Sequence, residues 1–187
     1  MLQNALQFSH FLLKEILTDY DHVIDATMGN GHDTSFLAQT VMPHGKVYAF
    51  DVQKQAILKT KERLIKHGLY EQVELILDGH EHLNNYLAKN ESIKAAIFNL
   101  GYLPKGDKSL ITLPTTTTQA LDALLQHLAD KGRILLVSYY GHSGGEEELK
   151  MLNDYCRNLP QKQYNVLCYH FINQKNQPPI LFCIEKK

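Results

Sequence analysis

The chain has 187 residues, of which 44% are hydrophobic and 21% charged, and its formal net charge is −1. Such a chain is typical of one globular domain with a substantial core. The near-neutral charge excludes a protein whose whole surface attracts nucleic acid, so RNA contact would need a local basic patch. The cysteines, Cys156, Cys168 and Cys183, are odd in number and lack metal-ligand spacing. They indicate buried thiols in a reducing compartment, and no metal site is expected.

The N-terminal segment, residues 2–19, suits an amphipathic helix, because Leu6, Leu13, Ile16 and Leu17 recur on one face. Lys14 and Glu15 interrupt its apolar run, so it does not resemble a secretory signal. No stretch of about 18 apolar residues is present to span a bilayer. We therefore expect a cytoplasmic protein without membrane contact.

The next segment has the pattern strand, glycine loop, helix. The apolar run Val23–Thr27 predicts a strand, Gly29-Asn30-Gly31 a tight turn, and residues 33–40 a helix. Glycine tolerates positive φ and lets another molecule approach the backbone, while a helix N-terminus presents free N–H groups. This is typical of the first βα turn of a Rossmann-like sheet, where a nucleotide binds. The alternative is an ordinary turn without a ligand.

Further strands and helices alternate along the chain, which predicts a parallel sheet. The last two strands have no helix between them, so we expect an antiparallel hairpin. No linker or repeat divides the chain, and we expect a single domain, 1–187, with the helix of residues 1–20 packed on its core. The expected strands are 46–51, 73–78, 94–100, 133–140, 164–172 and 180–184, and the expected helices are 53–67, about 82–89, one opening at Thr115, and about 146–157.

Acidic residues end the second and third strands. Asp51 lies about 20 residues after the glycine loop, where a carboxylate can accept both hydroxyls of a ribose. Asp78 is a second candidate, with a helix N-cap as its alternative role. Thr34 stands where a dinucleotide-binding loop has its third glycine, which argues against NAD.

A parallel Rossmann sheet closed by a C-terminal hairpin resembles the class I S-adenosylmethionine-dependent methyltransferases. The resemblance implies a seven-stranded, mostly parallel sheet of order 3-2-1-4-5-7-6, helices on both faces, and S-adenosylmethionine as cofactor. In that group the first loop holds the methionine moiety, the acid after the second strand the ribose, and polar residues after the third strand the adenine. The corresponding cofactor candidates are Gly29, Asn30, Gly31, Asp33, Asp51, Gln53, Asp78, Gly79 and His80.

Three segments carry a narrower resemblance: Asp25–Thr34 (DATMGNGHDT), Asn99–Pro104 (NLGYLP) and Tyr140–Glu147 (YGHSGGEE). They are similar to the signatures of a small bacterial family first labelled "putative rRNA methylase" (the YtqB/MnmM type). That resemblance implies a tRNA methyltransferase that converts wobble 5-aminomethyl-2-thiouridine to its 5-methylaminomethyl form. It also implies the anticodon region of tRNA as partner, and a homodimer.

The acceptor should lie where the fourth and fifth strands end, because open α/β sheets bind ligands at that edge. Asn99-Leu100-Gly101-Tyr102 is similar to the Asn-Pro-Pro-Tyr loop of amino-methylating enzymes, where Asn accepts a hydrogen bond from the target nitrogen and Tyr stacks on the base. Here Leu100-Gly101 replace the prolines. Tyr140 and His142 follow the fifth strand, and His142 is a candidate proton acceptor. Turn, anchoring or capping roles remain the alternatives for all four catalytic candidates, Asn99, Tyr102, Tyr140 and His142.

Lys105 and Lys108 follow the fourth strand and are candidate phosphate contacts, with a solvated basic loop as the alternative. Four other functions stay open. The acceptor could be an rRNA base or a small-molecule amine, or the chain could be a non-catalytic Rossmann module that binds RNA. An NAD-dependent oxidoreductase fits the loop least well.

Overall fold

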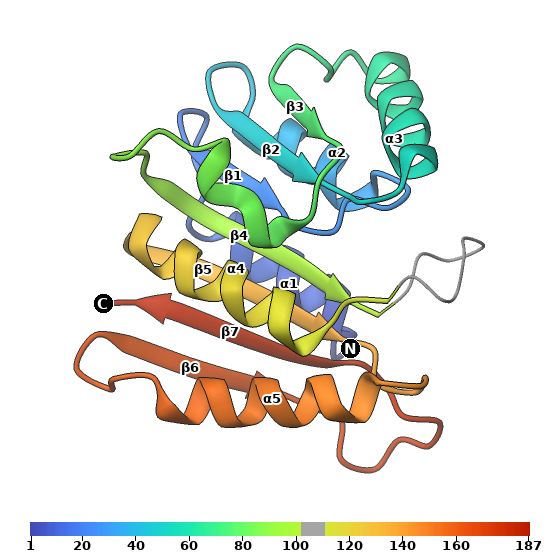
Figure 1. Ribbon diagram of the computed structural model, residues 1–187, viewed down its shortest axis with the longest axis vertical. Helices are drawn as coiled ribbons and strands as arrows, with labels where there is room; N and C mark the ends of the chain where they lie inside the picture. The colour runs from blue at the N-terminus through green and yellow to red at the C-terminus, as the bar shows by residue number, and fades with distance from the viewer. Residues whose placement is uncertain (102–110) are drawn as a thin grey trace.

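The computed structural model describes residues 1–101 and 111–187. Its centre is a seven-stranded sheet of order β3-β2-β1-β4-β5-β7-β6 (Figure 1), which confirms the predicted fold class. Strands β1 to β5 pair in parallel, whereas β7 runs antiparallel between β5 and β6. The strands are β1 (His22–Asp25), β2 (Lys46–Phe50), β3 (Val73–Ile76), β4 (Ile93–Leu100), β5 (Leu128–Ser138), β6 (Tyr164–Tyr169) and β7 (Ile180–Lys186).

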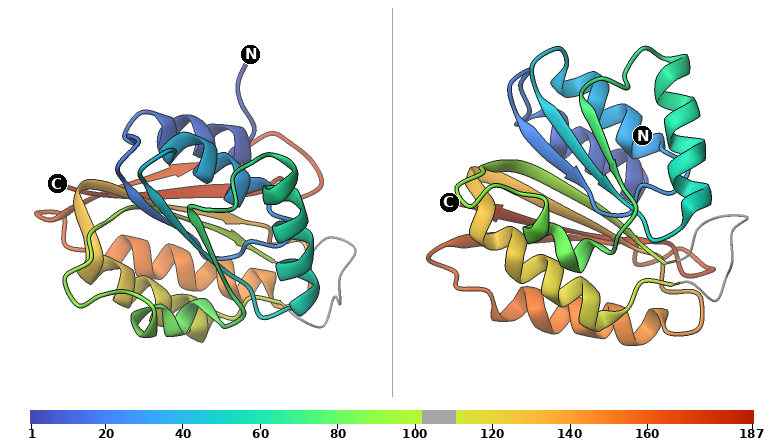
Figure 2. Two further views of the ribbon diagram at one scale, coloured as in Figure 1. Left: turned by 90° about the horizontal axis from the view of Figure 1, so that it is seen from above. Right: turned by 45° about the horizontal axis from the view of Figure 1, so that its top comes forward.

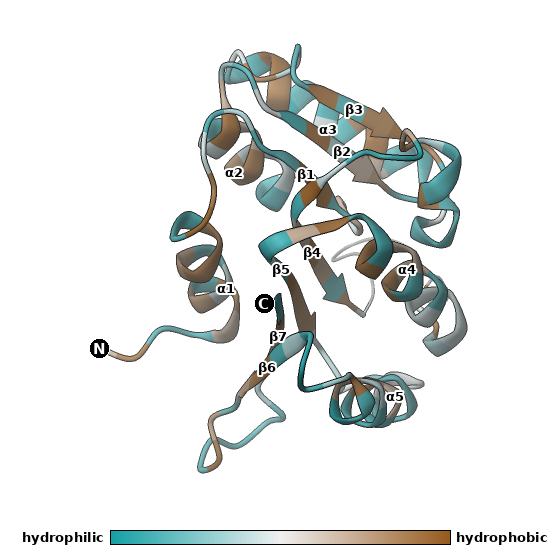
Figure 3. Cartoon of the chain, turned by 90° about the vertical axis from the view of Figure 1, so that its left-hand side faces the viewer, coloured by the Kyte–Doolittle hydropathy of each residue, from teal (hydrophilic) through white to brown (hydrophobic). Residues whose placement is uncertain are grey.

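Helices cover both faces of this sheet. Two views show α1 and α2 on one face and η1, α4 and α5 on the other (Figure 2), and Figure 3 shows the strands between them as largely hydrophobic. The central strands are buried on both sides, so they read as continuous apolar runs rather than alternating ones. The helices are α1 (Ala5–Lys14), α2 (His32–Val41), α3 (Lys54–Lys66), the 3₁₀ helix η1 (His80–Asn85), α4 (Pro114–His127) and α5 (Gly145–Asn158).

The N-terminal helix α1 packs on the sheet beside β5 and β7. Its buried residues Leu12 and Leu13 belong to the apolar cluster that α2 and α3 also cover. Arg133 of β5 anchors the C-terminal part of α1. Its Nη1 donates to the carbonyl oxygen of Leu12 over 2.7 Å and to a carboxylate oxygen of Glu15 over 2.8 Å. In this position of α1, His10 lies next to Asp33 in the first turn of α2.

Several element boundaries differ from the predicted ones. The first helix covers Ala5–Lys14 rather than residues 2–19, and it begins at Ala5 because Asn4 and Gln7 form a capping box there. The segment predicted as helix 82–89 is the 3₁₀ helix His80–Asn85. Strand β5 begins at Leu128, five residues earlier than expected, because Lys131-Gly132 reads as a helix stop yet lies within the strand. Lys131 adopts a left-handed φ of 56° there.

The expectation of three buried cysteines is wrong for one of them. Cys156 and Cys183 are buried, whereas Cys168 is exposed. Cys168 lies on β6, one of the two edge strands, and four of the six residues of β6 are exposed. Among the described residues no helix is long and apolar enough to cross a membrane.

Candidate active site at the carboxyl edge of the sheet

The glycine loop between β1 and α2 is held by α3. Gly29 and Gly31 have φ of 50° and 75°, values that other residues rarely adopt. A Cβ atom on Gly31 would lie 2.7 Å from Oγ1 of Thr60, so it is α3 that approaches the backbone there. The Thr60 hydroxyl donates to the Gly29 carbonyl over 3.1 Å, and Nε of Arg63 donates to the Asn30 carbonyl over 2.9 Å. The loop is therefore shaped before any ligand binds.

Asp51, at the carboxyl end of β2, faces this loop. Its Oδ2 accepts the backbone N–H of Gly29 over 3.0 Å, and its Oδ1 accepts that of Gln53 over 2.8 Å. Burial raises the pKa of Asp51, and these two backbone N–H groups oppose that effect. Each carboxylate oxygen has two lone pairs, so the group keeps acceptor capacity for ribose hydroxyls. The acceptor oxygens of Asp51 therefore fit the predicted ribose contact.

The two polar candidates after β3 lie in different surroundings. Asp78 accepts hydrogen bonds from the Gly79 N–H, His82 and the Tyr86 hydroxyl over 2.8 to 2.9 Å, and the bond from His82 is the main cause of its lowered pKa. His80 is only 8% exposed, and its Nδ1 donates to the Ala26 carbonyl over 3.0 Å. The structure thus places the His80 side chain inside the core. Its contact with a cofactor stays a prediction.

Asp25 is a buried acid that sequence reasoning did not select. It is fully buried at the end of β1, where its carboxylate accepts the Thr34 hydroxyl over 2.6 Å and the Thr27 N–H over 3.2 Å. Burial, together with the neighbouring charge of Asp33, raises the pKa of Asp25 to about 7. An acid that ends an apolar strand beside a glycine loop was the signal in the sequence.

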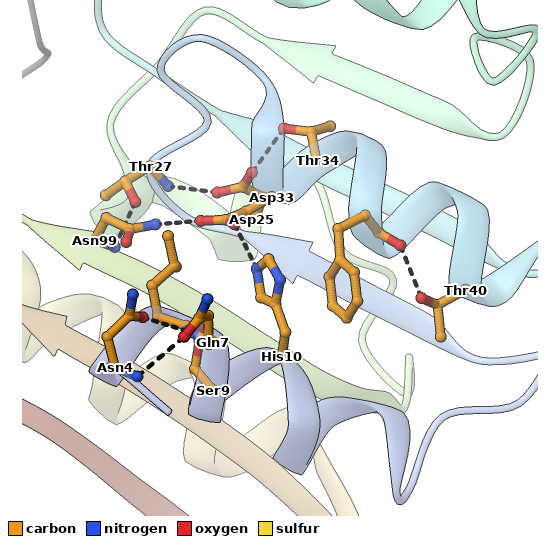
Figure 4. A network of polar contacts seen from close by, with 12 residues as sticks. Asn4, Gln7, Ser9, His10, Asp25, Thr27, Asp33, Thr34, Thr40 and Asn99 are labelled. Atoms are coloured by element: carbon orange, nitrogen blue, oxygen red, sulfur yellow. Dashed lines mark hydrogen bonds and ion pairs between the residues drawn. The ribbon is translucent and has the colours of Figure 1, made fainter. Parts of the chain in front are cut away.

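Asp33 lies in the first turn of α2, directly after the glycine loop, and contacts the end of β4 through its side chain (Figure 4). Its Oδ2 accepts a hydrogen bond from Nδ2 of Asn99 over 2.5 Å, and its Oδ1 accepts one from Nε2 of His10 over 2.6 Å. The backbone N–H of Asn99 donates to the Thr27 hydroxyl over 2.7 Å. The structure therefore brings the predicted acceptor residue Asn99 against the predicted cofactor residue Asp33.

The segment after β5 lies beside the end of β4. A Cβ atom on Gly101 would lie 3.3 Å from Cβ of Tyr139 and 3.5 Å from Nε2 of His142, so both neighbour the chain that follows Asn99. Burial and the charge of Asp33 raise the pKa of Tyr139. Tyr140 instead packs against the apolar cluster that α4 and α5 cover. The structure thus brings His142, but not Tyr140, toward the predicted acceptor site.

Tyr140 is the candidate predicted from the sequence, but the structure places its neighbour Tyr139, rather than Tyr140, on the Asn99 face of the sheet. A catalytic role of either tyrosine stays a prediction. Successive residues of a strand point to opposite faces, and the Tyr139 N–H still pairs with the Leu100 carbonyl over 2.9 Å. Val137, two residues earlier, belongs to the cluster on the α1 and α2 face. Counting from that apolar residue would have placed Tyr139 on the Asn99 face.

Three predicted residues, Tyr102, Lys105 and Lys108, lie outside the described residues and stay predictions. The chain on either side of them is anchored by Glu148 of α5, which is 2% exposed. Its carboxylate accepts the hydroxyls of Thr112 and Thr117 over 2.6 and 2.8 Å. The Thr112 hydroxyl in turn accepts the Gly101 N–H over 3.0 Å, so Glu148 is linked through Thr112 to Gly101.

The charges around the loop favour a cationic ligand over a pyrophosphate. Asp25, Asp33 and Asp51 lie around one loop. Burial raises the pKa of all three groups Asp25, Asp51 and Tyr139, and the charge of Asp33 adds to the rise at Asp25 and Tyr139. Carboxylates repel phosphates but suit an ammonium or a sulfonium group and hydroxyl donors. S-adenosylmethionine carries all three groups, so the site fits it. Within residues 1–101 and 111–187 no group of three or more His, Cys, Asp or Glu could hold a metal ion.

Known proteins with similar sequences and structures identify the family of the chain. The sequence profile of the family described as "Putative rRNA methylase" matches residues 47–185. A "tRNA (mnm(5)s(2)U34)-methyltransferase, chloroplastic" from Arabidopsis thaliana is 35% identical over 193 residues, which cover 99% of this chain and 70% of the relative.

Two solved structures of similar proteins align over their full lengths. One, from Clostridium thermocellum, is described as a "putative rRNA-methylase"; it has 43% identity and a TM-score of 0.97, and the alignment covers 100% of both chains. The other, a "putative methyltransferase" from Streptococcus mutans in complex with SAH, has 42% identity and a TM-score of 0.91, again over 100% of both chains. The chain therefore belongs to the rRNA methylase family of S-adenosylmethionine-dependent methyltransferases.

Proposed function

We propose that the chain transfers a methyl group from S-adenosylmethionine to the 5-aminomethyl group of wobble (2-thio)uridine in tRNA. The product is the 5-methylaminomethyl nucleoside. The observation that carries this proposal is the placement of Asn99, whose amide lies against the cofactor loop through Asp33. The name of the Arabidopsis relative supports the choice of acceptor.

The residues of the edge divide the task between donor and acceptor. Bound S-adenosylmethionine supplies a methyl group that is already electrophilic. Asn99 Oδ1 accepts a hydrogen bond from the target amine and so orients its nitrogen. Holding both reactants in line can supply roughly 7–11 kcal/mol of the barrier. The new N–C bond forms as the S–C bond breaks, and the amine then loses a proton, for which His142 is the proposed acceptor.

The amine must reach the methyl group without its proton, and burial serves this need. A primary alkyl amine is mostly protonated at neutral pH, and a desolvated pocket disfavours the charged form. Tyr139 stands beside Gly101 and Asp33, where burial raises its own pKa. Burial of the same kind lowers the pKa of an amine placed there, and it must outweigh the charge of Asp33, which acts in the opposite direction.

Binding of RNA requires a basic surface, and α3 presents basic residues beside the glycine loop. Lys59, Arg63 and Lys66 lie at spacings of four and three residues, which put them on one helix face. Arg63 contacts the loop through Asn30 and His32. In the described part of the chain none of the three forms an ion pair with a carboxylate. We propose that this face contacts phosphates of tRNA, together with Lys105 and Lys108.

Charge reversal tests this surface. The double variant Lys59→Glu/Lys66→Glu should weaken tRNA binding about tenfold at low salt and flatten its salt dependence. Cofactor affinity should stay unchanged in calorimetry. The control is Lys162→Glu/Lys175→Glu, which alters the same charge on the C-terminal hairpin region. Equal loss of tRNA binding in both double variants would remove α3 from the interface.

The remaining proposals concern organisation. We propose that the chain acts in the cytoplasm as a single methyltransferase domain, 1–187, and as a homodimer. The exposed apolar residues of the edge strand β6, Val166 and Leu167, are 39% and 45% exposed and support a self-contact there. Sedimentation of Leu167→Glu against the unchanged chain tests it, because a monomer in both would exclude the dimer.

Labelled S-adenosylmethionine and tRNA carrying the unmethylated aminomethyl group test the function. We expect label only in the 5-methylaminomethyl nucleoside after digestion. The family description makes rRNA the second substrate to offer in the same assay. Label in an rRNA base, or in a small amine alone, would overturn the tRNA proposal. Cofactor binding without transfer to any of them would indicate a non-catalytic module.

A further inference from the structure

His10 lies on α1, the helix that precedes the alternating strands and helices, and its side chain reaches the candidate site. Its Nε2 lies 2.6 Å from Oδ1 of Asp33. Its ring stacks on Phe36 of α2, with centroids 3.9 Å apart and planes inclined by 3°. Figure 4 shows His10 pointing from α1 toward Asp33. The side chains of His10 and Asp33 are 27% and 9% exposed, so their contact is largely shielded from water. A packed ring and a short hydrogen bond together fix the position of the imidazole.

The chemistry of the contact determines which atoms face one another. A carboxylate accepts hydrogen bonds and has no proton to donate. Nε2 of His10 must therefore carry a proton, and the group of Asn99 that faces Asp33 must be its NH₂. The amide oxygen of Asn99 consequently points away from Asp33. The usual ambiguity between the amide oxygen and nitrogen of an asparagine is resolved by this neighbour.

The same contact strengthens Asn99 as an acceptor. An amide that donates to a charged carboxylate is polarised, and its oxygen becomes a better acceptor. The Thr27 hydroxyl holds the backbone N–H of Asn99 over 2.7 Å, so backbone and side chain are fixed from two directions. Both oxygens of Asp33 are already engaged by protein groups, His10 on one and Asn99 on the other.

We propose that His10 and Asp33 are positioning residues that aim Oδ1 of Asn99 at the target amine. His10 orients Asp33, and Asp33 orients Asn99. This inference rests on the proposed function, because it assigns Asn99 to the acceptor. It differs from the predicted role of Asp33 as a cofactor contact, which would appear in cofactor affinity rather than in turnover.

Two substitutions of His10 separate its hydrogen bond from its ring. His10→Phe keeps the ring stacked on Phe36 and removes the donor. His10→Gln keeps an N–H donor near the position of Nε2 and removes the ring. We expect His10→Phe to lower kcat on tRNA at least about tenfold and His10→Gln to stay within about threefold of the unchanged chain. The dissociation constant for S-adenosylmethionine and the KM for tRNA should change by less than about twofold in both.

A second measurement needs no substrate. In ¹H–¹⁵N spectra of the free protein, the side-chain NH₂ of Asn99 is identified by its loss in Asn99→Ala. We expect this signal to move in Asp33→Asn and in His10→Phe, and to stay near its original position in His10→Gln. Thermal unfolding of each variant serves as the folding control.

The outcomes are distinct. Equal loss of kcat in both His10 variants would mean that the ring only packs, and a loss confined to cofactor affinity would return Asp33 to the cofactor. Either result overturns the inference, as does an Asn99 NH₂ signal that keeps its position in His10→Phe. If the unchanged chain leaves tRNA unmethylated, the proposed function fails. The Asn99 signal then still decides whether His10 and Asp33 hold the amide.

Discussion

The two halves of the carboxyl edge are built in different ways. The cofactor half, around Gly29 and Asp51, is made by backbone groups near the glycine loop and by one strand-end carboxylate. The acceptor half joins Asn99 of β4, Asp33 of α2 and His10 of α1 through side chains. Backbone geometry tolerates changes of sequence nearby, whereas a chain of side-chain contacts depends on each member. A loss at one half should therefore appear as weaker binding, and a loss at the other as slower turnover.

Removal of the acceptor amide tests this contrast most strongly. Asn99→Ala should lower kcat on tRNA about a hundredfold, because it removes the group that orients the amine. Cofactor affinity should change by less than about threefold. Steady-state kinetics and calorimetry measure the two effects, with Asn158→Ala on α5 as the matched control. A larger change in cofactor affinity than in kcat would show that Asn99 belongs to the cofactor half rather than the acceptor half.

The cofactor half predicts the opposite pattern. Asp51→Ala should weaken S-adenosylmethionine binding by about 10- to 100-fold, the value of hydrogen bonds to a charged group. At saturating cofactor, kcat should stay within about threefold. Asp51→Asn keeps one acceptor oxygen, so its affinity for S-adenosylmethionine should lie between those of the unchanged chain and of Asp51→Ala. Unchanged affinity in Asp51→Ala would remove this carboxylate from the site.

These halves also differ in how far the sequence predicts them. The strand–loop–helix pattern around Gly29 and the spacing to Asp51 are local, and hydrophobic periodicity predicted the sheet and its terminal hairpin. The link from His10 to Asp33 spans 23 residues and that from Asp33 to Asn99 spans 66. No local pattern encodes such pairs, because they depend on how α1 and α2 pack over the sheet. His10 could be recognised only after packing was known.

The tyrosine pair after β5 sharpens the contrast within the acceptor half. Tyr139→Ala should lower kcat about tenfold, because its ring stands beside Asp33 and Gly101. Tyr140→Ala should instead lower the melting temperature, since its ring packs on the core under α4 and α5. Kinetics and thermal unfolding of both variants distinguish these roles. Slower turnover in Tyr140→Ala with normal stability would restore the original choice of Tyr140.

Asp25 lies where the two halves meet, and its effect depends on pH. Its pKa is raised from 3.8 to about 7 by burial and by Asp33, so the folded chain binds a proton that the unfolded chain releases between these values. The stability it contributes is therefore present at low pH and is lost as the pH rises through about 7.

Asp25→Asn mimics the protonated side chain and removes this dependence. In the free protein, the melting temperatures of variant and unchanged chain should agree near pH 4, where Asp25 is protonated in the folded chain and about half protonated in the unfolded chain, and should separate as the pH rises to about 7. Near pH 8.5 the variant should melt about 5 °C higher, because a buried charge beside Asp33 has been removed. Other titrating groups cancel in the difference between the two curves. A difference in melting temperature that stays constant from pH 5 to 8.5 would show that Asp25 is charged in the folded chain over this range. The charge of Asp33 in the acceptor half would then have no measurable effect on the pKa of Asp25.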